Sequence, residues 1–310
     1  MDFLDGLSTN RMPRRDGGIA LSYFPNRRGR IELEVVIARL DHQNYYLICA
    51  VFYERRLLDH LARYRTTERV RWENRTESWS ALAVNGPRAR DVLNACFSAT
   101  VGNSEFPWFT TKQIEIAGYN ALAMRMSYAG ELGWELHMPK QAALPIYDAI
   151  AESGRQFGIV DYGSYAMNVL RLEKAFKGAA ELTNEVTVAE ANVLQFVDFD
   201  RRFIGKEATV SSLDSNLRWK CVYLEVDADG DSDGHGGEAV LRGDRAIGTV
   251  TSIVYSHTTQ TILAFAYLEP EAIDSPAPLT VLIQNKRRDA RLLSEPAYDS
   301  ARNKLQIQVV

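Results

Sequence analysis

The sequence has few cysteines and no long apolar run, and each shortage excludes a class of protein. Its three cysteines, Cys49, Cys96 and Cys221, lie far apart and give neither a disulfide framework nor a zinc-binding spacing. We therefore expect a reducing compartment, and hence a cytoplasmic protein. No stretch approaches the roughly 20 apolar residues that cross a membrane, and no charged-then-apolar signal segment opens the chain. The sequence thus predicts no membrane partner.

An excess of positive charge is also missing. The net charge is -4, which argues against nucleic acid or an anionic membrane as the main partner. The basic stretch from Arg27 to Arg30 is either a site for an acidic ligand or, as is more common, a solvated loop. With 46% hydrophobic and 25% charged residues over 310 positions, the composition is typical of a globular protein of about two or three domains.

The common catalytic and metal motifs are absent. There is no G-x-G-x-x-G, no Walker loop and no G-x-S-x-G elbow, and the five histidines show no ligand spacing. The stretch DADGDSDGHGGE, residues 227–238, resembles a calcium loop at first sight. With Asp229, Asp231 and Asp233 as the first ligands, however, Val240 stands at position twelve, where a bidentate Glu is needed. We interpret this stretch as a polar hairpin loop and expect no metal site.

Hydrophobic periodicity divides the chain into a mixed part and an all-β part. Strands are expected at 19–24, 31–40 and 45–51, with helices over 52–64, 142–158 and 164–176. Residues 119–139 are expected to form two strands around a Gly-containing turn. After about residue 203, short apolar runs recur at regular intervals between turns, which is typical of a small β-barrel or sandwich.

Four stretches together resemble the glycine-cleavage T-protein (aminomethyltransferase) family. They are FPNRRGRIELEVVIARL, SYAGELGWELHMP, the helix and loop from SYAMNVLRLEKAF to FIGKEA, and AIGTVTSIVYSHTTQTILAFAYL. They occur in the family's order and cover nearly the whole chain. The forms S-Y-x-G-E-L-G-W-E-L and Y-A-M-N-x-x-R-L-E-K are closest to the folate-binding C-terminal half of dimethylglycine and sarcosine dehydrogenases.

The resemblance implies an α+β fold, a cloverleaf of mixed α/β subdomains around a tetrahydrofolate pocket with a C-terminal all-β barrel. We expect a discontinuous folate-binding subdomain (1–72 with 164–205), a second α+β subdomain (73–163) and the barrel (206–310). The chain starts inside the family's first motif helix. It is therefore expected to lack a first strand and the flavin domain of the dehydrogenases.

The resemblance also suggests which acid holds the folate. A pterin presents an N–H and an amino group side by side, and a carboxylate accepts both in a charge-assisted pair. The second Glu of the 127–139 stretch, Glu135, takes this role in the family, with Tyr128 packing or hydrogen-bonding at the ring. Glu131, in the turn, is more simply interpreted as a surface charge.

A second acid is expected near the carbon that moves. One-carbon transfer passes through a positively charged nitrogen group, which a carboxylate can hold or deprotonate. The family uses the second Asp of a D-D pair, and this chain has Leu33 and Glu34 there. The resemblance thus makes Glu34 the catalytic candidate. The alternation in IELEVVI leaves open that Glu32 and Glu34 merely form the solvent face of a strand.

Further positions are carried over with an alternative beside each. Tyr46 and Ile48 fall where the family lines the pterin pocket, although core packing explains them equally well. Tyr255 closes the pocket from the barrel or belongs to the barrel core. Arg171 and Glu173 are interpreted as structural, with Arg171 bridging a carboxylate. Met167 replaces an Arg of the glycine-cleavage type, which weakens the aminomethyltransferase interpretation more than the folate one.

The function implied is tetrahydrofolate-dependent transfer of a methyl or methylene group from an N-methyl or aminomethyl donor. The alternatives are a scaffold recruited for other chemistry, or a folate-binding accessory subunit of a flavoprotein. A non-enzymatic iron–sulfur assembly branch of the family is disfavoured, because RRFIGKEA lacks that branch's Cys.

Overall fold

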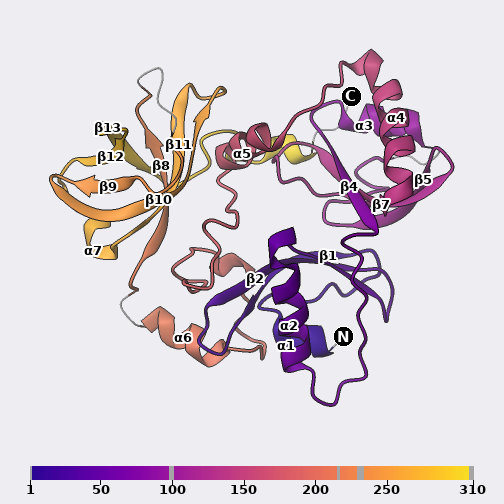
Figure 1. Ribbon diagram of the computed structural model, residues 1–310, viewed down its shortest axis with the longest axis horizontal. Helices are drawn as coiled ribbons and strands as arrows, with labels where there is room; N and C mark the ends of the chain where they lie inside the picture. The colour runs from indigo at the N-terminus through magenta and orange to yellow at the C-terminus, as the bar shows by residue number, and fades with distance from the viewer. Residues whose placement is uncertain (1, 98–100, 215–216, 229–233, 307–310) are drawn as a thin grey trace.

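A computed structural model describes residues 2–97, 101–214, 217–228 and 234–306, and these contain three separate sheets. Asp229, Asp231 and Asp233, the first three ligand positions of the calcium-like loop, lie outside the described residues. Figure 1 shows the sheets as three lobes, with helix α5 between the barrel and the second sheet. One sheet falls within each predicted sequence range; the domain boundaries themselves stay a prediction.

The first sheet has the order β1-β2-β3 and is antiparallel. A turn at Asn26–Arg30 joins its first two strands, and Gly29 within it has a φ of +71°. A Cβ at Gly29 would lie 2.9 Å from the backbone nitrogen of Thr209, so glycine allows both the turn and the close approach of helix α6. The elements here are α1 (Asp2–Leu7), β1 (Ile19–Pro25), β2 (Ile31–Arg39), β3 (Tyr45–Ile48), α2 (Glu54–Tyr64) and, later in the chain, α6 (Lys206–Asp214).

The second sheet has the order β4-β7-β6-β5, and α3 and α4 pack on one face of it. Helix α4 continues through a short 3-10 turn to Gly158, whose φ of +72° is typical of a glycine that ends a helix. The elements are β4 (Trp79–Asn85), α3 (Ala89–Cys96), β5 (Thr111–Ile116), β6 (Tyr119–Met124), β7 (Gly133–Pro139) and α4 (Ala143–Gly154), followed by α5 (Ser164–Glu173).

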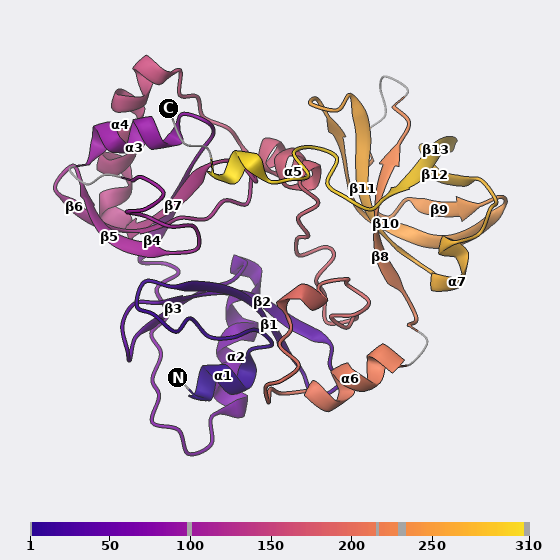
Figure 2. The same cartoon turned by 180° about the vertical axis from the view of Figure 1, so that it is seen from behind.

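The C-terminal part is a closed barrel of six antiparallel strands, in the order β10-β11-β8-β13-β12-β9, as Figure 2 shows from behind. The expected all-β barrel is therefore confirmed. A buried apolar cluster that includes Leu224, Ile247 and Val281 fills it. Its elements are β8 (Lys220–Val226), β9 (Ala239–Arg242), β10 (Arg245–Ser256), β11 (Thr261–Leu268), α7 (Pro270–Ile273), β12 (Leu279–Ile283) and β13 (Lys286–Leu293).

Two predicted elements are corrected. The third strand was expected to run to residue 51, but β3 ends at Ile48, and residues 51–53 form a 3-10 turn that leads into α2. The expected turn within 119–139 is an eight-residue connection, 125–132, rather than a tight hairpin. In the first case, residues with strand-like side chains leave the sheet because the 3-10 turn and α2 begin there.

Candidate functional site

The two faces of β2 have different partners. Leu33, Val35 and Ile37 are buried against α1 and α2. Glu34, Val36 and Ala38 alternate with them on the opposite face. Ala38 is fully buried, and Glu34 and Val36 are half-buried. The interpretation of this face as a plain solvent face is therefore wrong, because the second sheet and the segment after α5 cover most of it.

Glu34 has a buried tyrosine as its cross-strand partner. Tyr23 pairs with it in the β1–β2 register, and the Tyr23 hydroxyl donates a hydrogen bond to Glu34 Oε1 at 3.3 Å. Burial raises the pKa of Glu34 from 4.5 to about 7; the bond from Tyr23 lowers it, and the nearby Glu181 carboxylate raises it. The site thus holds a carboxyl group that exchanges its proton near neutral pH.

The pKa of Glu34 is expected to rise further in the variant Tyr23→Phe. The hydroxyl stabilises the charged form, so its loss should raise this pKa by about 0.5 to 1 unit, the equivalent of one hydrogen bond. A ¹³C NMR titration of the glutamate carboxyl groups measures the change in pKa. The control is Tyr119→Phe, at an exposed position on β6 of the second sheet. A pKa that falls in Tyr23→Phe would contradict the assigned role of the bond.

The second acid lies on β7, facing the first sheet. Trp134, Leu136 and Met138 point into the core with α3 and α4, whereas Glu135 and His137 alternate with them. Glu135 Oε2 lies 3.4 Å from His137 Nε2. His137 Nδ1 in turn lies 3.4 Å from the Tyr46 hydroxyl, so this chain of contacts leads from β7 to the first sheet.

Tyr46 and Ile48 lie between the two acids. They pair with Ala38 and Val36 across the β2–β3 register, and therefore share the face that carries Glu34. The strand rise puts the backbone of Glu34 about 13 Å from that of Ala38. The Tyr46 ring also contacts Trp79, with centroids 5.8 Å apart. Tyr46 thus links Glu135 to the face of the first sheet that carries Glu34, and we call this region between the two sheets the junction.

Tyr128 joins this group from the 125–132 connection. Its hydroxyl donates to the Lys177 carbonyl at 3.1 Å, and its ring stacks on Phe176 with centroids 6.5 Å apart. Burial raises the pKa of Tyr128 to about 12; Arg171 lowers it and the Glu34 carboxylate raises it. Glu131 is not a free surface charge: it lies 3.8 Å from the buried Lys174 ammonium.

Tyr255 is not brought to this junction. Its ring packs against the interior cluster of the barrel, and its hydroxyl donates to Gln260 Oε1 at 3.0 Å. Ser252 and Ser256 lie on the opposite face of β10 from Tyr255. They bind Glu181, in the segment after α5, and Glu173, at the end of α5, respectively. Of the two interpretations of Tyr255, its position fits the barrel core.

The expected ion pair of Arg171 is confirmed. Arg171 Nη1 lies 3.1 Å from Glu181 Oε2, and both side chains are buried. Its Nη2 donates to Ser252 Oγ at 2.8 Å, while Thr251 Oγ1 donates to Glu181 Oε1 at 2.7 Å. This network ties α5 and the following segment to β10, beside Glu34.

Two residues of the junction are missing from the sequence-based set. His137 had a signal, because it stands two positions after Glu135 on the same strand and therefore on the same face. Tyr23 had none: counting back from the 26–30 turn puts it opposite Leu33, and the shift in register between Phe24 and Pro25 places it opposite Glu34 instead.

Other expectations concern ligands and membranes. Arg27 and Arg28 line a recess of about 450 Å³ with Arg63 and Tyr64, away from the junction. Within the described ranges, no three His, Cys, Asp or Glu side chains are arranged to hold a metal ion. In the same part of the chain, no helix is long and apolar enough to span a bilayer.

Comparison with known proteins identifies the fold and the family. The family described as the GCVT N-terminal domain matches residues 1–201, and the glycine cleavage T-protein C-terminal barrel domain matches residues 220–299. The aminomethyltransferase T of the glycine cleavage system from Bartonella henselae superposes with a TM-score of 0.81 at 19% identity, over 96% of this chain and 81% of that one.

Two groups of curated relatives match the chain. Mitochondrial dimethylglycine dehydrogenases of Mus musculus and Homo sapiens are each 32% identical over 98% of the chain. The chain spans only 35% and 36% of those proteins. The aminomethyltransferase of Thermoanaerobacter sp. strain X514 is 28% identical over 96% of the chain and 81% of its own length. These relatives are named as enzymes. With both domains matched in order, the chain belongs to the glycine-cleavage T-protein family.

Proposed function

We propose that the protein catalyses tetrahydrofolate-dependent transfer of a one-carbon unit, methyl or methylene, at the junction of the first two sheets. The observation that carries this proposal is the placement of two carboxyl groups, Glu34 and Glu135, that are far apart in the sequence. Tyr46 and Ile48 share the face of the first sheet that carries Glu34, and Tyr46 leads through His137 to Glu135 on β7. The half-buried Glu135 carboxylate suits the polar edge of a ring, and the Glu34 carboxyl group exchanges a proton near neutral pH.

The residues present fit a pterin. Glu135 supplies carboxylate acceptors for two adjacent N–H groups, and His137, at 3.4 Å, positions it. Tyr46 and Ile48 give an aromatic and an apolar wall, and Tyr128, held on the Lys177 carbonyl and stacked on Phe176, supplies a further ring. Such a mostly apolar site with a few placed polar groups is typical for a flat heterocycle. Tetrahydrofolate, when bound, supplies the amine nitrogens that accept the carbon unit.

Glu34 is proposed to act on the reacting nitrogen. Its proton exchanges near pH 7, so it can take a proton from an amine or, when ionised, stabilise a positive charge there. The Tyr23 hydroxyl fixes one carboxyl oxygen, which leaves Oε2 to face the ligand. Glu is one methylene longer than the family's Asp, and Tyr23 holds this longer side chain in place.

The donor and the partner follow from the relatives. The dimethylglycine dehydrogenases act on an N-methylated amino acid by name, so we take a small N-methylated amine as the donor. An accessory role beside a flavoprotein is the second candidate. It is favoured by one fact, that these dehydrogenases are nearly three times as long as the region that matches this chain.

The folate site is tested by the variant Glu135→Gln. Loss of one charge-assisted hydrogen bond costs about 1.5–3 kcal/mol, so tetrahydrofolate affinity in calorimetry should fall about 10- to 100-fold. Glu115→Gln, at an exposed position on the same sheet, is the matched control and should bind as the parent does. If Glu135→Gln binds as tightly as the parent, Glu135 does not hold the pterin. If the parent itself does not bind tetrahydrofolate, the scaffold has been recruited for other chemistry.

A further inference from the structure

Tyr162, in the connection between α4 and α5, is held beside the strand pair that carries Glu135. The side-chain N–H of Asn85 donates to the Tyr162 hydroxyl at 2.5 Å. Asn85 is the last residue of β4 and pairs with Gly133 of β7. A Cβ at Gly133 would clash with Asn85 Oδ1, so the Asn85 side chain lies over this glycine. Because Gly133 and Glu135 are two positions apart on one strand, the contact lies on the face that carries Glu135.

A hydrogen bond from the 125–132 connection fixes the amide that holds Tyr162. Ser127 Oγ donates to Asn85 Oδ1 at 2.9 Å, so the two N–H groups of the amide are on the other side, toward Tyr162. Ser127 is itself buried. The tyrosine hydroxyl is therefore held in a defined position at the end of the β4–β7 pair.

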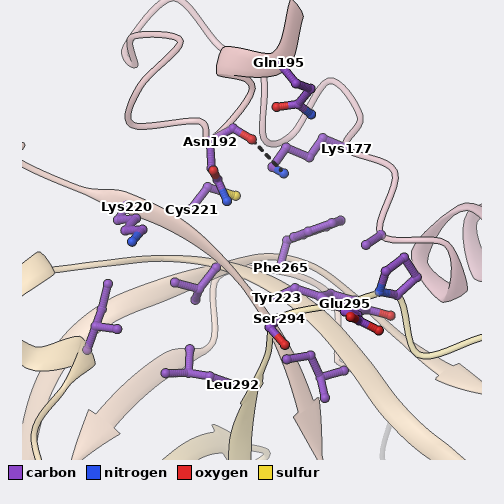
Figure 3. Close-up of a pocket in the computed structure, with 15 residues that line it drawn as sticks. Lys177, Asn192, Gln195, Lys220, Cys221, Tyr223, Phe265, Leu292, Ser294 and Glu295 are labelled. Carbon is purple, nitrogen blue, oxygen red and sulfur yellow. Dashed lines mark hydrogen bonds between the residues drawn. The ribbon is translucent and has the colours of Figure 1, made fainter. Parts of the chain in front are cut away.

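The residue after Ser127 is anchored to the barrel. The Tyr128 hydroxyl donates to the Lys177 carbonyl at 3.1 Å. Figure 3 shows the Lys177 side chain above Phe265: its ammonium lies 5.1 Å from the centre of that ring and 3.5 Å from the Asn192 carbonyl. The connection that carries Ser127 and Tyr128 is thus fixed on both sides, and with it the amide that holds Tyr162.

The Tyr162 hydroxyl still has a proton to donate. Its oxygen accepts the N–H of Asn85, and none of the described residues accepts its hydroxyl proton. Burial raises the pKa of Tyr162, the bond from Asn85 lowers it and the Glu135 carboxylate raises it, so the group keeps its proton at neutral pH. Tyr162 is 39% exposed and the Glu135 side chain 23% exposed, so a ligand can reach both.

The surface between these two groups is open. Ala83 of β4 is the cross-strand partner of Glu135 and is exposed. Cross-strand partners share a face, so only a methyl group covers the strand beside the Glu135 carboxylate. Asn85 follows Ala83 by two residues, about 7 Å along the strand. One fused pair of rings spans such a distance.

We propose that Tyr162 is a specificity-determining residue of the pterin site, its hydroxyl donating to the ring carbonyl oxygen beside the two N–H groups that Glu135 accepts. The inference rests on the proposed function and deepens it. The polar edge of a pterin presents a carbonyl acceptor, a ring N–H and an amino group in that order. Glu135 matches the two donors and Tyr162 matches the acceptor. A ring with an amino group in place of the carbonyl would set a donor against a donor.

The test is the variant Tyr162→Phe, which keeps the aromatic ring and removes only the hydroxyl. Loss of one neutral hydrogen bond should lower tetrahydrofolate affinity in calorimetry about 3- to 10-fold. Affinity for 6-methyltetrahydropterin, the ring head without the tail, should fall by the same factor in an NMR titration, because Tyr162 contacts the ring alone. Tyr165→Phe, three residues further on and 91% exposed, is the matched control and should bind both ligands as the parent does.

A second variant, Ala83→Val, tests the open surface independently. Ala83 is exposed on an edge strand, where a β-branched residue is well accommodated, so the variant should unfold at the same urea concentration as the parent. Its two added methyl groups would overlap the ring, and tetrahydrofolate affinity should fall about tenfold or more.

Parent-level tetrahydrofolate affinity in Tyr162→Phe overturns this inference alone, as does parent-level affinity in Ala83→Val. A loss for tetrahydrofolate without a loss for 6-methyltetrahydropterin also overturns it, because Tyr162 would then contact the tail. If the parent binds neither ligand, the proposed function fails together with this inference, so the titrations of the parent tell the two failures apart.

Discussion

Replacing Glu34 by Gln is expected to lower kcat for one-carbon transfer by about 10²- to 10⁴-fold, the usual contribution of a positioned acid–base group. Gln keeps the size of the side chain and one oxygen acceptor for the Tyr23 hydroxyl, but it can neither take a proton nor carry a negative charge. Tetrahydrofolate affinity should stay within about twofold of the parent, because Glu135 rather than Glu34 is proposed to bind the ring. Steady-state kinetics and calorimetry on the same preparation measure the two effects.

The same substitution should make the folded protein more stable at neutral pH and above. The pKa of Glu34 is raised from 4.5 to about 7, so its favourable contribution to folding is complete below pH 4.5 and is lost as the pH rises through 7. Gln does not ionise and avoids this loss. Glu34→Gln should therefore exceed the parent in free energy of unfolding by up to about 3 kcal/mol above pH 7, and by little at pH 4.5.

Glu32→Gln is the matched control, because Glu32 lies on the same strand but accepts a hydrogen bond from Asn26 in the turn and lines the recess beside Arg63 and Tyr64. It should leave kcat unchanged. Parent-level kcat in Glu34→Gln would remove Glu34 from the reaction. A large loss of folate affinity would move it to the binding of the ring.

The second large effect concerns stability. Arg171→Met removes the cationic partner of Glu181, whose side chain is fully buried. The remaining donors to that carboxylate are the hydroxyls of Thr251 and Ser252 and one backbone N–H. A buried charge left without its counter-ion typically costs about 3–5 kcal/mol. Urea unfolding followed by fluorescence should show a correspondingly lower midpoint.

Arg155→Met is the control for this loss. Arg155 pairs with Glu152 on the surface of the second sheet's lobe, and both side chains are mostly exposed. Exposed pairs contribute about 0–1 kcal/mol, so its unfolding midpoint should barely change. Equal midpoints for Arg171→Met and the parent would mean that the Arg171–Glu181 pair contributes nothing to stability.

Much of the fold follows from hydrophobic patterning. The alternation of Leu33, Val35 and Ile37, and the regular short strands after residue 203, predict the mixed part and the barrel. Local patterning failed where tertiary contacts decide. Cys49 and Val51 have strand-like side chains, yet the chain leaves the sheet at Ile48 to begin α2.

The candidate site was predictable only in part, because tertiary contacts also decide which of its residues meet. Family resemblance named Glu34 and Glu135, but only strand register and the packing of one sheet on another bring them to one junction. Tyr255 shows the limit of a motif. Its strand has a register shift between Val250 and Ser252, and which of its faces meets α5 is decided by the pairing with β11. Exposure predicted for Glu131 failed because Lys174 comes from a distant helix.

Lys174 also determines how the molecule can be divided. Its ammonium lies 2.8 Å from Asp299, beyond the last barrel strand, and 3.8 Å from Glu131 of the second sheet's connection. Gly130 makes room for it, since a Cβ there would clash with the Lys174 side chain. Removing the residues after Leu293 would remove Asp299. The buried ammonium of Lys174 would then keep only Glu131, at 3.8 Å, as a counter-charge. The segment after Leu293 thus holds the end of α5 in place through the Lys174–Asp299 ion pair, and grafting or circular permutation should retain this segment.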